Sequence, residues 1–256
     1  IVKKLGQGGM AAVYQATDQR QYGVVWAIKE MSDSFITNAA ERPEALRAFQ
    51  QEATLLRSLN HPNMPKVVDV FTEGGKHYLV MEYVPGQTLG NMLESRHYQP
   101  LPEIDVVPWA VQLCDVLEYL HSQNIIFRDL KPDNIMITPQ GQIKLIDFGI
   151  VRFFKPGKSK DTQALGTPGY AAPEASGGQT DGRSDIYSMC ATLHQLLTGH
   201  DPSTTIYMIP PARQINPNVS LLMNQVLSRG LQAHRTARWT SAGELRAAFM
   251  QLPPFA

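Results

Sequence analysis

Hydrophobic and polar residues alternate along much of the first 84 residues, a pattern typical of half-buried β-strands. From Glu44 to Leu59 the apolar residues instead recur at steps of three and four, which predicts one helix among these strands. The turn Glu73–Gly75 between the last two strands favours a hairpin. Five strands are predicted: Ile1–Leu5, Ala12–Ala16, Val24–Glu30, Lys66–Thr72 and His77–Tyr83.

The pattern changes after Pro85–Gly86, where long stretches with helical periodicity follow. Helices are predicted at Ile104–Ser122, Ser184–Thr198, Leu221–Leu231 and Ala242–Leu252, with short strands at Ile135–Thr138 and Gln142–Ile146. The last helix begins with Ser241 and Glu244, three residues apart, which predicts a capping box. A long irregular tract runs from Phe148 to about Gly182. We therefore expect an α+β fold, in which a small lobe of antiparallel sheet plus one helix is followed by a larger, mainly helical lobe.

The composition is that of a folded domain without a dominant charge. Of the 256 residues, 43% are hydrophobic and 18% are charged, which argues against a disordered segment. Lys and Arg together number 23, as do Asp and Glu, so no whole-surface attraction to nucleic acid or to an anionic membrane is expected. No apolar run approaches the roughly 18 residues needed to span a bilayer. Cys114 and Cys190 lie in apolar stretches and are expected to be buried thiols.

Three glycines, Gly6, Gly8 and Gly9, lie between the first two predicted strands. Glycine lets backbone N–H groups approach phosphate oxygens that a Cβ atom would keep away. The same glycines would also suit a plain hairpin turn, so this segment alone does not decide between the two. No predicted helix follows them, which argues against a Walker loop or a dinucleotide-binding turn.

The third predicted strand carries Lys29, and a period of two places it on one face with Val25 and Ala27. A strand lysine is most often a solvated edge charge. Glu52 changes this interpretation, because 100° per residue places it within the apolar stripe of the predicted helix. An unpaired carboxylate there would cost on the order of several kcal/mol, so we expect Lys29 to be its partner.

Three oxygen-bearing side chains, Asp129, Asn134 and Asp147, each end or follow a short apolar strand. Carboxylate and amide oxygens suit Mg²⁺, which usually takes the rest of its shell from water and phosphate. Each of these residues alone is common in turns. Their order along the chain, after the glycines and the Lys29–Glu52 pair, is what indicates a phosphate and metal site.

This ordered set resembles the eukaryotic-type (Hanks-type) protein kinase family, and the likeness covers essentially the whole chain. Residues 166–174 look like the end of an activation segment, and Asp185–Ser188 like the start of the central buried helix. Arg238 is placed like the arginine that pairs with the carboxylate of Ala-Pro-Glu, here Glu174. Asp-Leu-Lys at 129–131 is similar to the serine/threonine branch, and Gly-Gly-Met in the first loop to its bacterial members.

The resemblance implies one two-lobed catalytic domain over residues 1–256. Its N-lobe would cover 1–84 and its C-lobe 85–256, with the activation segment at 147–174. It also implies transfer of the γ-phosphoryl group of ATP to serine or threonine hydroxyls of protein substrates. Mg²⁺ would be the metal, and Mn²⁺ could replace it.

The resemblance assigns roles residue by residue. Asp129 would accept the proton of the substrate hydroxyl, and Lys131 would offset charge on the γ-phosphoryl group. Lys29, held by the glutamate at 52, would bind the α- and β-phosphates, while Asn134 and Asp147 would hold Mg²⁺. The remaining expected nucleotide contacts come from the glycine loop, the walls of the adenine site and the link between the lobes: Gly6, Gln7, Gly8, Gly9, Met10, Ala11, Val13, Ala27, Met81, Glu82, Val84 and Met136.

Three residues depart from the family pattern. Ala11 replaces the third loop glycine, Phe127 replaces the histidine before Arg-Asp, and Cys190 replaces a glycine of the central helix. Phe127 is expected to keep the packing and to lose one hydrogen bond. Thr167 is expected to contact the catalytic aspartate and lysine as a structural hydroxyl. Thr162 is preferred to Ser159 as the expected phosphorylation site, and Arg128 would bind the phosphate. The alternative is that both residues are ordinary loop hydroxyls.

Two other functions are weighed against a protein kinase. Ala11 and Phe127 would suit a pseudokinase scaffold that binds nucleotide without catalysis, but Lys29, Asp129 and the two metal-type residues are all intact. A small-molecule kinase of similar fold lacks the Ala-Pro-Glu segment and the Asp-X-Lys spacing. For the kinase we expect a cytoplasmic domain without membrane contact, and a transient dimer for autophosphorylation. Any membrane anchor or further domain is expected outside this segment.

Overall fold

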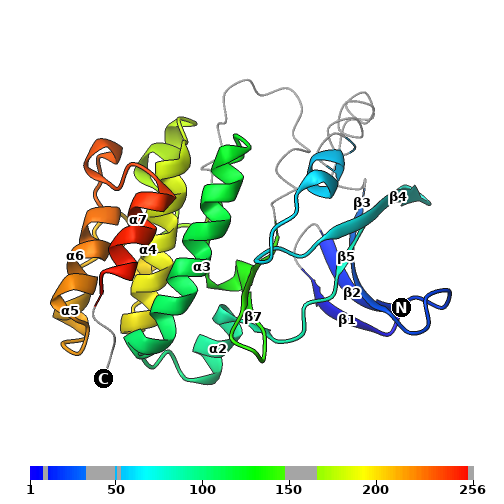
Figure 1. Cartoon of the computed structure of the whole chain (residues 1–256), viewed down its shortest axis with the longest axis horizontal. Coiled ribbons are helices and arrows are strands. Elements are labelled where there is room, and N and C mark those ends of the chain that lie inside the picture. Colours follow the sequence, from blue (N-terminus) through cyan, green and yellow to red (C-terminus); the bar gives the residue numbers. More distant parts are fainter. Residues whose placement is uncertain (8–10, 33–49, 51–52, 148–165, 253–256) are drawn as a thin grey trace. The chain divides into compact units, whose positions relative to one another are not determined.

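The computed structural model describes residues 1–7, 11–32, 50, 53–147 and 166–252 (Figure 1). The chain divides into two compact units. Unit 1 holds residues 1–85 together with Asp147, and unit 2 holds residues 86–146 and the described residues from 166 onward. Unit 1 is built on one antiparallel sheet and unit 2 is mainly helical.

The sheet of unit 1 has five antiparallel strands in the order β1-β2-β3-β5-β4 (Figure 1). The strands are β1 (Lys3–Gln7), β2 (Ala11–Thr17), β3 (Val25–Ser32), β4 (Val67–Glu73) and β5 (Lys76–Glu82). All five were predicted, with ends that differ by one or two residues. In the register, Lys29 of β3 lies opposite Val13 of β2 and Leu79 of β5. The central strand therefore carries the lysine between two apolar neighbours.

The buried face of β3 follows the predicted period of two. Ala27, Lys29 and Met31 are buried, whereas Ile28 and Glu30 between them are only half-buried. Residue 50 and residues 53–58 are helical, and Ala53, Leu56 and Leu59 are buried, as the predicted apolar stripe requires. The rest of the predicted helix, including Glu52, lies outside the described residues.

Unit 2 contains six α-helices and a three-stranded sheet within its described residues (Figure 1). The helices are α2 (Leu89–Ser95), α3 (Glu103–Ser122), α4 (Gly182–Thr198), α5 (Ala212–Ile215), α6 (Leu221–Gly230) and α7 (Ala242–Met250). The small sheet joins β6 (Gln87–Thr88), β7 (Ile135–Ile137) and β8 (Ile143–Leu145) in that order. Short 3₁₀ turns lie at Pro132–Asn134, Pro173–Gly177, Pro202–Thr205 and Arg235–Ala237.

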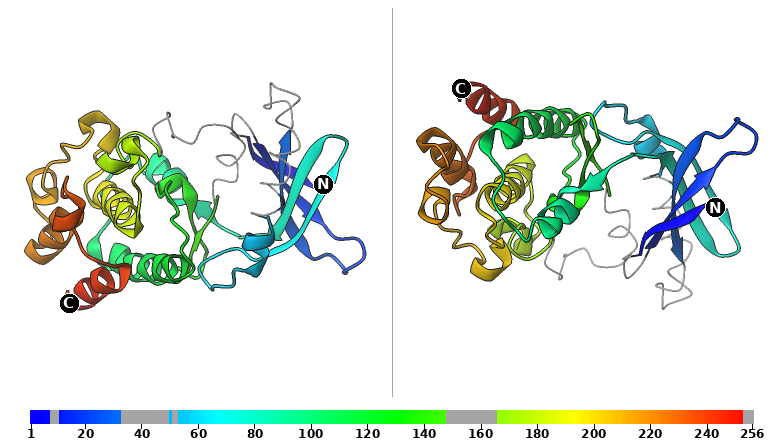
Figure 2. Two further views of the ribbon diagram at one scale, coloured as in Figure 1. Left: turned by 90° about the horizontal axis from the view of Figure 1, so that it is seen from above. Right: turned by 90° about the horizontal axis from the view of Figure 1, so that it is seen from below.

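Helix α4 is the centre of unit 2. Every residue from 184 to 198 is buried, because α3, α5, α6 and α7 all pack against this helix (Figure 2). Cys114 of α3 and Cys190 of α4 are free, buried thiols, as expected, and burial raises the pKa of Cys190 to about 12. A Cβ atom on Gly230 would lie 2.2 Å from the Cys190 sulfur, so the glycine makes room for this cysteine.

The cap of α7 and the start of α4 differ from the sequence analysis. Ser241 caps α7 by accepting from the Glu244 N–H, but the Glu244 carboxylate accepts from Thr240 instead of completing a capping box. The complete capping box lies at α4, between Asp181 and Ser184, so this helix begins two residues before the predicted start.

The tract predicted as irregular from 148 to about 182 contains a 3₁₀ turn in its described part. Helices α2 and α5 were not predicted, because segments of seven and four residues are too short for a clear helical period. None of the helices described is long and apolar enough to cross a bilayer.

Candidate active site

The loop that carries Asp129 is fixed by a buried carboxylate of α4. Asp185 is fully buried, and its Oδ2 accepts from the Phe127 N–H at 2.9 Å, while its Oδ1 accepts from the Arg128 N–H at 2.7 Å. Arg128 has a φ of 69°, in the left-handed region that non-glycine residues rarely adopt. These two bonds satisfy the backbone N–H groups of the two residues directly before Asp129.

Asp129 is held by a threonine and faces a lysine. Thr167 donates to Asp129 Oδ1 from its backbone N–H at 3.2 Å and from its hydroxyl at 2.8 Å. Lys131 Nζ donates to the same hydroxyl at 3.0 Å and lies 3.9 Å from Asp129 Oδ2. The predicted contact of Thr167 with Asp129 and Lys131 is therefore confirmed. The geometry holds a partly exposed carboxylate in one orientation and keeps an ammonium group beside it.

Asn134 lies at the end of the 3₁₀ turn that follows Lys131. Its Nδ2 donates to the Asp129 carbonyl at 2.7 Å and to Asp129 Oδ2 at 3.2 Å. No residue that the structure describes donates to Asn134 Oδ1, so this oxygen stays available as a ligand. The described residues hold no group of three His, Cys, Asp or Glu side chains arranged for a metal. An amide oxygen with few carboxylates fits Mg²⁺, which draws most of its ligands from water and phosphate.

Lys29 makes its ion pair with Asp147. The Lys29 Nζ lies 2.5 Å from Asp147 Oδ1, and the lysine side chain is 8% exposed whereas the aspartate side chain is 49% exposed. Asp147 has a φ of 63° and comes two residues after β8. The preceding residue, Ile146, donates its backbone N–H to the Asn134 carbonyl. The expected pairing of Lys29 with Glu52 falls outside the described residues.

Other expected nucleotide contacts lie on the sheet of unit 1. Ala27 is buried and lies opposite Met81 in the register of β3 and β5. The Glu82 N–H donates to the Lys66 carbonyl, so this N–H is already engaged. Val84 is buried near the end of unit 1. These positions remain predictions as nucleotide contacts.

The glycine loop is described only at its ends. Gly6 and Gln7 of β1 lie opposite Val13 and Ala12 of β2, and Gly8, Gly9 and Met10 lie outside the described residues. A Cβ atom on Gly6 would meet none of the described residues within 4 Å. Met136, expected to contact adenine from the other lobe, lies in β7 opposite Thr88 and Lys144.

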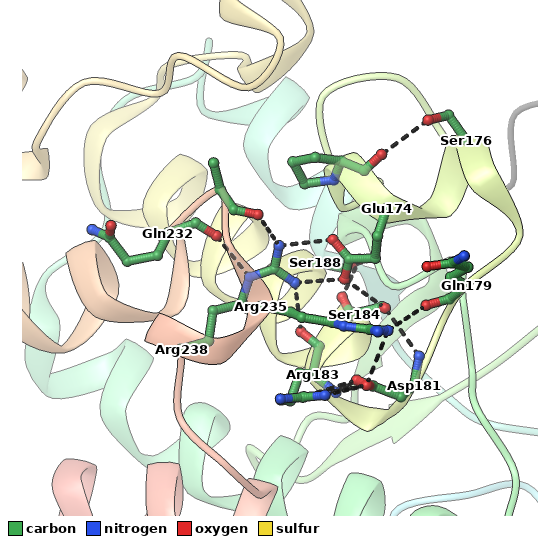
Figure 3. Close-up of polar contacts among 12 residues, drawn as sticks. Glu174, Ser176, Gln179, Asp181, Arg183, Ser184, Ser188, Gln232, Arg235 and Arg238 are labelled. Carbon is green, nitrogen blue, oxygen red and sulfur yellow. Dashed lines mark hydrogen bonds and ion pairs between the residues drawn. The ribbon is translucent and has the colours of Figure 1, made fainter.

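A second polar cluster joins the end of the predicted activation segment to the C-terminal part of unit 2 (Figure 3). Arg238 donates to both Glu174 oxygens, at 2.7 and 2.8 Å, which confirms the predicted pair. Its other N–H groups donate to backbone carbonyls of Arg183, Gln232 and Ala233. The Ser184 hydroxyl also donates to Glu174. All five donors of a completely buried guanidinium are thus satisfied.

The same cluster lowers the pKa of Glu174. Burial by itself raises this pKa, but the hydrogen bonds from Arg238 and Ser184 outweigh burial, and the net shift is downward. Beside it, Asp181 pairs with Arg183 at 2.6 Å and with Arg235 at 3.5 Å. The sequence analysis did not identify Asp181 and Arg235. The sequence signal for Asp181 is its position as a capping residue three positions before Ser184, and Arg235 has no comparable signal.

The structure therefore groups the predicted site residues within each unit. In unit 2 it brings together Asp129, Lys131 and Asn134, and in unit 1 it brings together Lys29 and Asp147. It adds Asp185, whose role a sequence does not reveal, because an aspartate in the first turn of a helix is ordinarily an exposed dipole partner.

Comparisons with known proteins agree with this geometry. Residues 1–247 match the protein kinase domain family. The serine/threonine-protein kinase PknB of Mycobacterium leprae is 33% identical over 95% of this chain and 41% of its own length. The serine/threonine-protein kinase PknD of Mycobacterium tuberculosis is 31% identical over 97% of this chain and 38% of its own length. The chain thus spans about two fifths of the curated relatives it matches.

Among solved structures, the kinase domain of Mycobacterium tuberculosis PknI superposes with a TM-score of 0.77 and 27% identity, covering 98% of this chain and 94% of that one. The five-stranded sheet and the helical unit therefore have the architecture of a protein kinase. The chain belongs to the protein kinase family, on the Hanks-type serine/threonine branch that these bacterial relatives represent.

Proposed function

We propose that this chain transfers the γ-phosphoryl group of ATP to serine and threonine hydroxyls of protein substrates, as one catalytic domain over residues 1–256. The observation that carries this proposal is the arrangement around Asp129 in unit 2. Thr167 fixes one carboxylate oxygen at 2.8 Å, and the Lys131 ammonium lies 3.9 Å from the other. This is what a base that orients a hydroxyl beside a transferring phosphoryl group requires.

In the proposed reaction, Asp129 orients the substrate hydroxyl and accepts its proton. Lys131 offsets the charge that develops on the transferring group. Lys29 binds the α- and β-phosphates, and its burial in the sheet supports this role because a buried ammonium is poorly solvated and gains from an anionic partner. Nucleotide phosphates would have to compete with Asp147 for the lysine. Glu52 holds Lys29 in this proposal, as the resemblance implies.

Asn134 and Asp147 are the residues that would hold Mg²⁺, or Mn²⁺ in its place. The metal would neutralise phosphate charge when bound. The Asn134 amide supports this assignment, since Nδ2 is committed to Asp129 and Oδ1 is left as an acceptor. The loop from Gly6 to Val13 would cover the phosphates, and Ala27, Met81, Glu82, Val84 and Met136 would contact adenine.

The proposed substrates are proteins, among them a second copy of this chain in a transient dimer. A formal net charge of zero gives the domain no general electrostatic attraction to nucleic acid or to an anionic membrane. This supports a domain that binds neither. We propose a cytoplasmic location for it. The residues from 147 to 174 are proposed as the activation segment. Thr162 is proposed as its phosphorylation site, and Arg128 as the residue that binds the phosphate.

The experiment is transfer of radiolabelled phosphate from ATP to a mixture of unfolded acceptor proteins, followed by phosphoamino-acid analysis. Wild type with Mg²⁺ is expected to yield phosphoserine and phosphothreonine, and Lys29→Met to yield neither. Labelled phosphotyrosine alone, or label on small hydroxyl compounds only, would contradict the proposed acceptor. A protein that binds ATP but transfers no phosphate with Mg²⁺ or Mn²⁺ would be a pseudokinase.

A further inference from the structure

Gln112, in the middle of α3, forms hydrogen bonds with the backbone of the hairpin that joins β7 and β8. Its Oε1 accepts from the Ile143 N–H at 3.0 Å, and its Nε2 donates to the Gly141 carbonyl at 3.5 Å. One backbone group is a donor and the other an acceptor, so together they fix the orientation of the side-chain amide. A single glutamine thus binds the chain on both sides of Gln142.

The two backbone groups lie on the edge of β8 that faces away from β7. Both backbone groups of Gln142 are used on the β7 side, because its N–H donates to the Thr138 hydroxyl at 3.2 Å and its carbonyl accepts from the Thr138 N–H at 2.9 Å. Neighbouring residues of an extended chain direct their backbone groups to opposite edges, so the Gly141 carbonyl and the Ile143 N–H lie on the other edge. Within the part of the chain that the structure describes, β8 is the last strand of its sheet. The Gln112 amide therefore takes the place that a further strand would occupy.

The hairpin is short, and its outer edge is buried. Strands β7 and β8 have three residues each, and Ile143 has no exposed surface. A buried N–H without an acceptor is costly, because water cannot replace the lost partner. Helix α3 is 20 residues long and packs against β8, so an amide on this helix is a rigid partner. Gln112 therefore fixes the position of β8 along the helix.

The same hairpin carries the proposed metal-binding residues at its two ends. Asn134 directly precedes β7, and Asp147 comes two residues after β8. The Ile146 N–H donates to the Asn134 carbonyl at 2.8 Å, so the two ends of the hairpin are joined. A shift of β8 along α3 would displace Ile146 and strain this bond.

We propose that Gln112 is a positioning residue for the metal site. It fixes β8 against α3 and, through the bond between Ile146 and Asn134, orients the residues that would hold Mg²⁺. The consequence for Mg²⁺ rests on the proposed function, whereas the fixed position of β8 does not.

The test compares Gln112→Met, a side chain of similar length that lacks the amide, with Gln112→Glu, which keeps an acceptor for the Ile143 N–H. Gln123→Met, at the exposed C-terminal end of α3, is the matched control for the substitution itself. Leu113→Ala, at a buried position of the same helix, is the control for general loss of stability. The measurements are amide hydrogen exchange at Ile143 and Ile146, the free Mg²⁺ concentration for half-maximal phosphoryl transfer, and the unfolding temperature.

For Gln112→Met we expect exchange at Ile143 and Ile146 to become about tenfold faster, the effect of losing roughly one hydrogen bond. The Mg²⁺ concentration for half-maximal transfer should rise about tenfold, because groups that orient metal ligands affect metal affinity on this scale. Gln112→Glu should lie between wild type and Gln112→Met in both measurements. Gln123→Met should match wild type. Leu113→Ala should lower the unfolding temperature without a selective change at the two amides or in the Mg²⁺ requirement.

Wild-type exchange at Ile143 and Ile146 in Gln112→Met would overturn the proposal. So would an unchanged Mg²⁺ requirement in an active Gln112→Met, or exchange in Gln112→Glu as fast as in Gln112→Met. If wild type transfers no phosphate, the proposed function fails by itself. Exchange at the two amides then still supports the fixation of β8 if it is faster in Gln112→Met, and overturns it if it is unchanged.

Discussion

Asp129 and Glu174 are both carboxylates of unit 2 with a basic side chain nearby, but their surroundings differ. Glu174 receives two short hydrogen bonds from a completely buried guanidinium. Asp129 is oriented by Thr167 and an amide, and the Lys131 ammonium lies 3.9 Å away. The first carboxylate is in direct contact with its cation, whereas the second is held in one orientation with its cation at a greater distance. Two carboxylates with a basic side chain nearby are therefore paired to different degrees in this unit.

The two basic side chains differ in how many of their N–H donors are already hydrogen-bonded. Arg238 has no donor left for a ligand, and its guanidinium also lies 4.9 Å from the centre of the Tyr187 ring. Within the described part of the chain Lys131 makes one hydrogen bond, to the Thr167 hydroxyl, and its side chain is 22% exposed. A lysine with unused N–H donors can still bind an incoming anion. The predictions below test this distinction, beginning with the largest effect.

Asp129→Asn should lower the rate of phosphoryl transfer by about 10²- to 10⁴-fold, the usual contribution of a general base. Asparagine keeps the shape and an acceptor oxygen for Thr167, so the unfolding temperature should change little. Asp105→Asn, at an exposed aspartate of α3, is the matched control and should retain the wild-type rate. An equal fall in transfer rate in both variants would contradict a specific role for Asp129 in the reaction.

Arg238→Ala should destabilise the protein by about 3–5 kcal/mol, because it leaves the Glu174 carboxylate without its buried partner. Urea unfolding monitored by circular dichroism measures this. Arg229→Ala is the control, since Arg229 pairs with Glu244 at a half-exposed surface and lies 3.8 Å from the centre of the Trp239 ring. Its loss should cost no more than about 2 kcal/mol. A similar urea midpoint of unfolding for the two variants would contradict the larger contribution of Arg238 to stability.

Thr167→Val should lower kcat about tenfold while leaving stability near that of wild type. Valine has the same shape but lacks the hydroxyl that accepts from Lys131 and donates to Asp129, so both groups lose a hydrogen bond. Steady-state kinetics with a serine peptide provides the measurement, and Thr167→Ser should recover most of the rate. A serine variant as slow as the valine variant would argue against a role for the hydroxyl.

Acid should remove the stabilising contribution of the Glu174 carboxylate. The pKa of Glu174 in the folded protein lies below its usual value of 4.5, so its contribution to stability is present above pH 4.5 and is lost as the pH falls through the folded pKa. The unfolding free energy of wild type should therefore fall more steeply below pH 4.5 than that of Glu174→Gln. Parallel pH profiles for the two proteins would contradict this.

The sequence predicted the positions of single residues better than their partners. The period of two in β3 was enough to predict that Lys29 lies on the same face as Ala27, because alternation fixes which side a strand residue faces, and the structure shows both to be buried. Its ion pair with Asp147 joins residues 118 positions apart, and no periodicity carries such information. The pairs Thr167–Asp129 and Glu174–Arg238 came from the family resemblance, not from pattern.

Local capping shows a similar limit. The spacing of Ser241 and Glu244 predicted a reciprocal box, but Thr240 offers both an N–H and a hydroxyl, and the glutamate binds those instead. Asp181 forms the complete box at α4, although its sequence gives no sign of the arginines that it also binds. Whether a glutamate completes a capping box therefore depends on other hydrogen-bond donors in the neighbouring residue.

The most direct test of the central claim measures phosphoryl transfer and stability together in two variants. Single-turnover transfer from ATP to a serine peptide and the unfolding midpoint are recorded for wild type, Asp129→Asn and Arg238→Ala. The account predicts that Asp129→Asn loses transfer and keeps the wild-type midpoint. It predicts that Arg238→Ala loses stability and, under conditions where it stays folded, retains most of the transfer rate. A folded Arg238→Ala that is as inactive as Asp129→Asn, or an Asp129→Asn that transfers phosphate like wild type, would contradict the account.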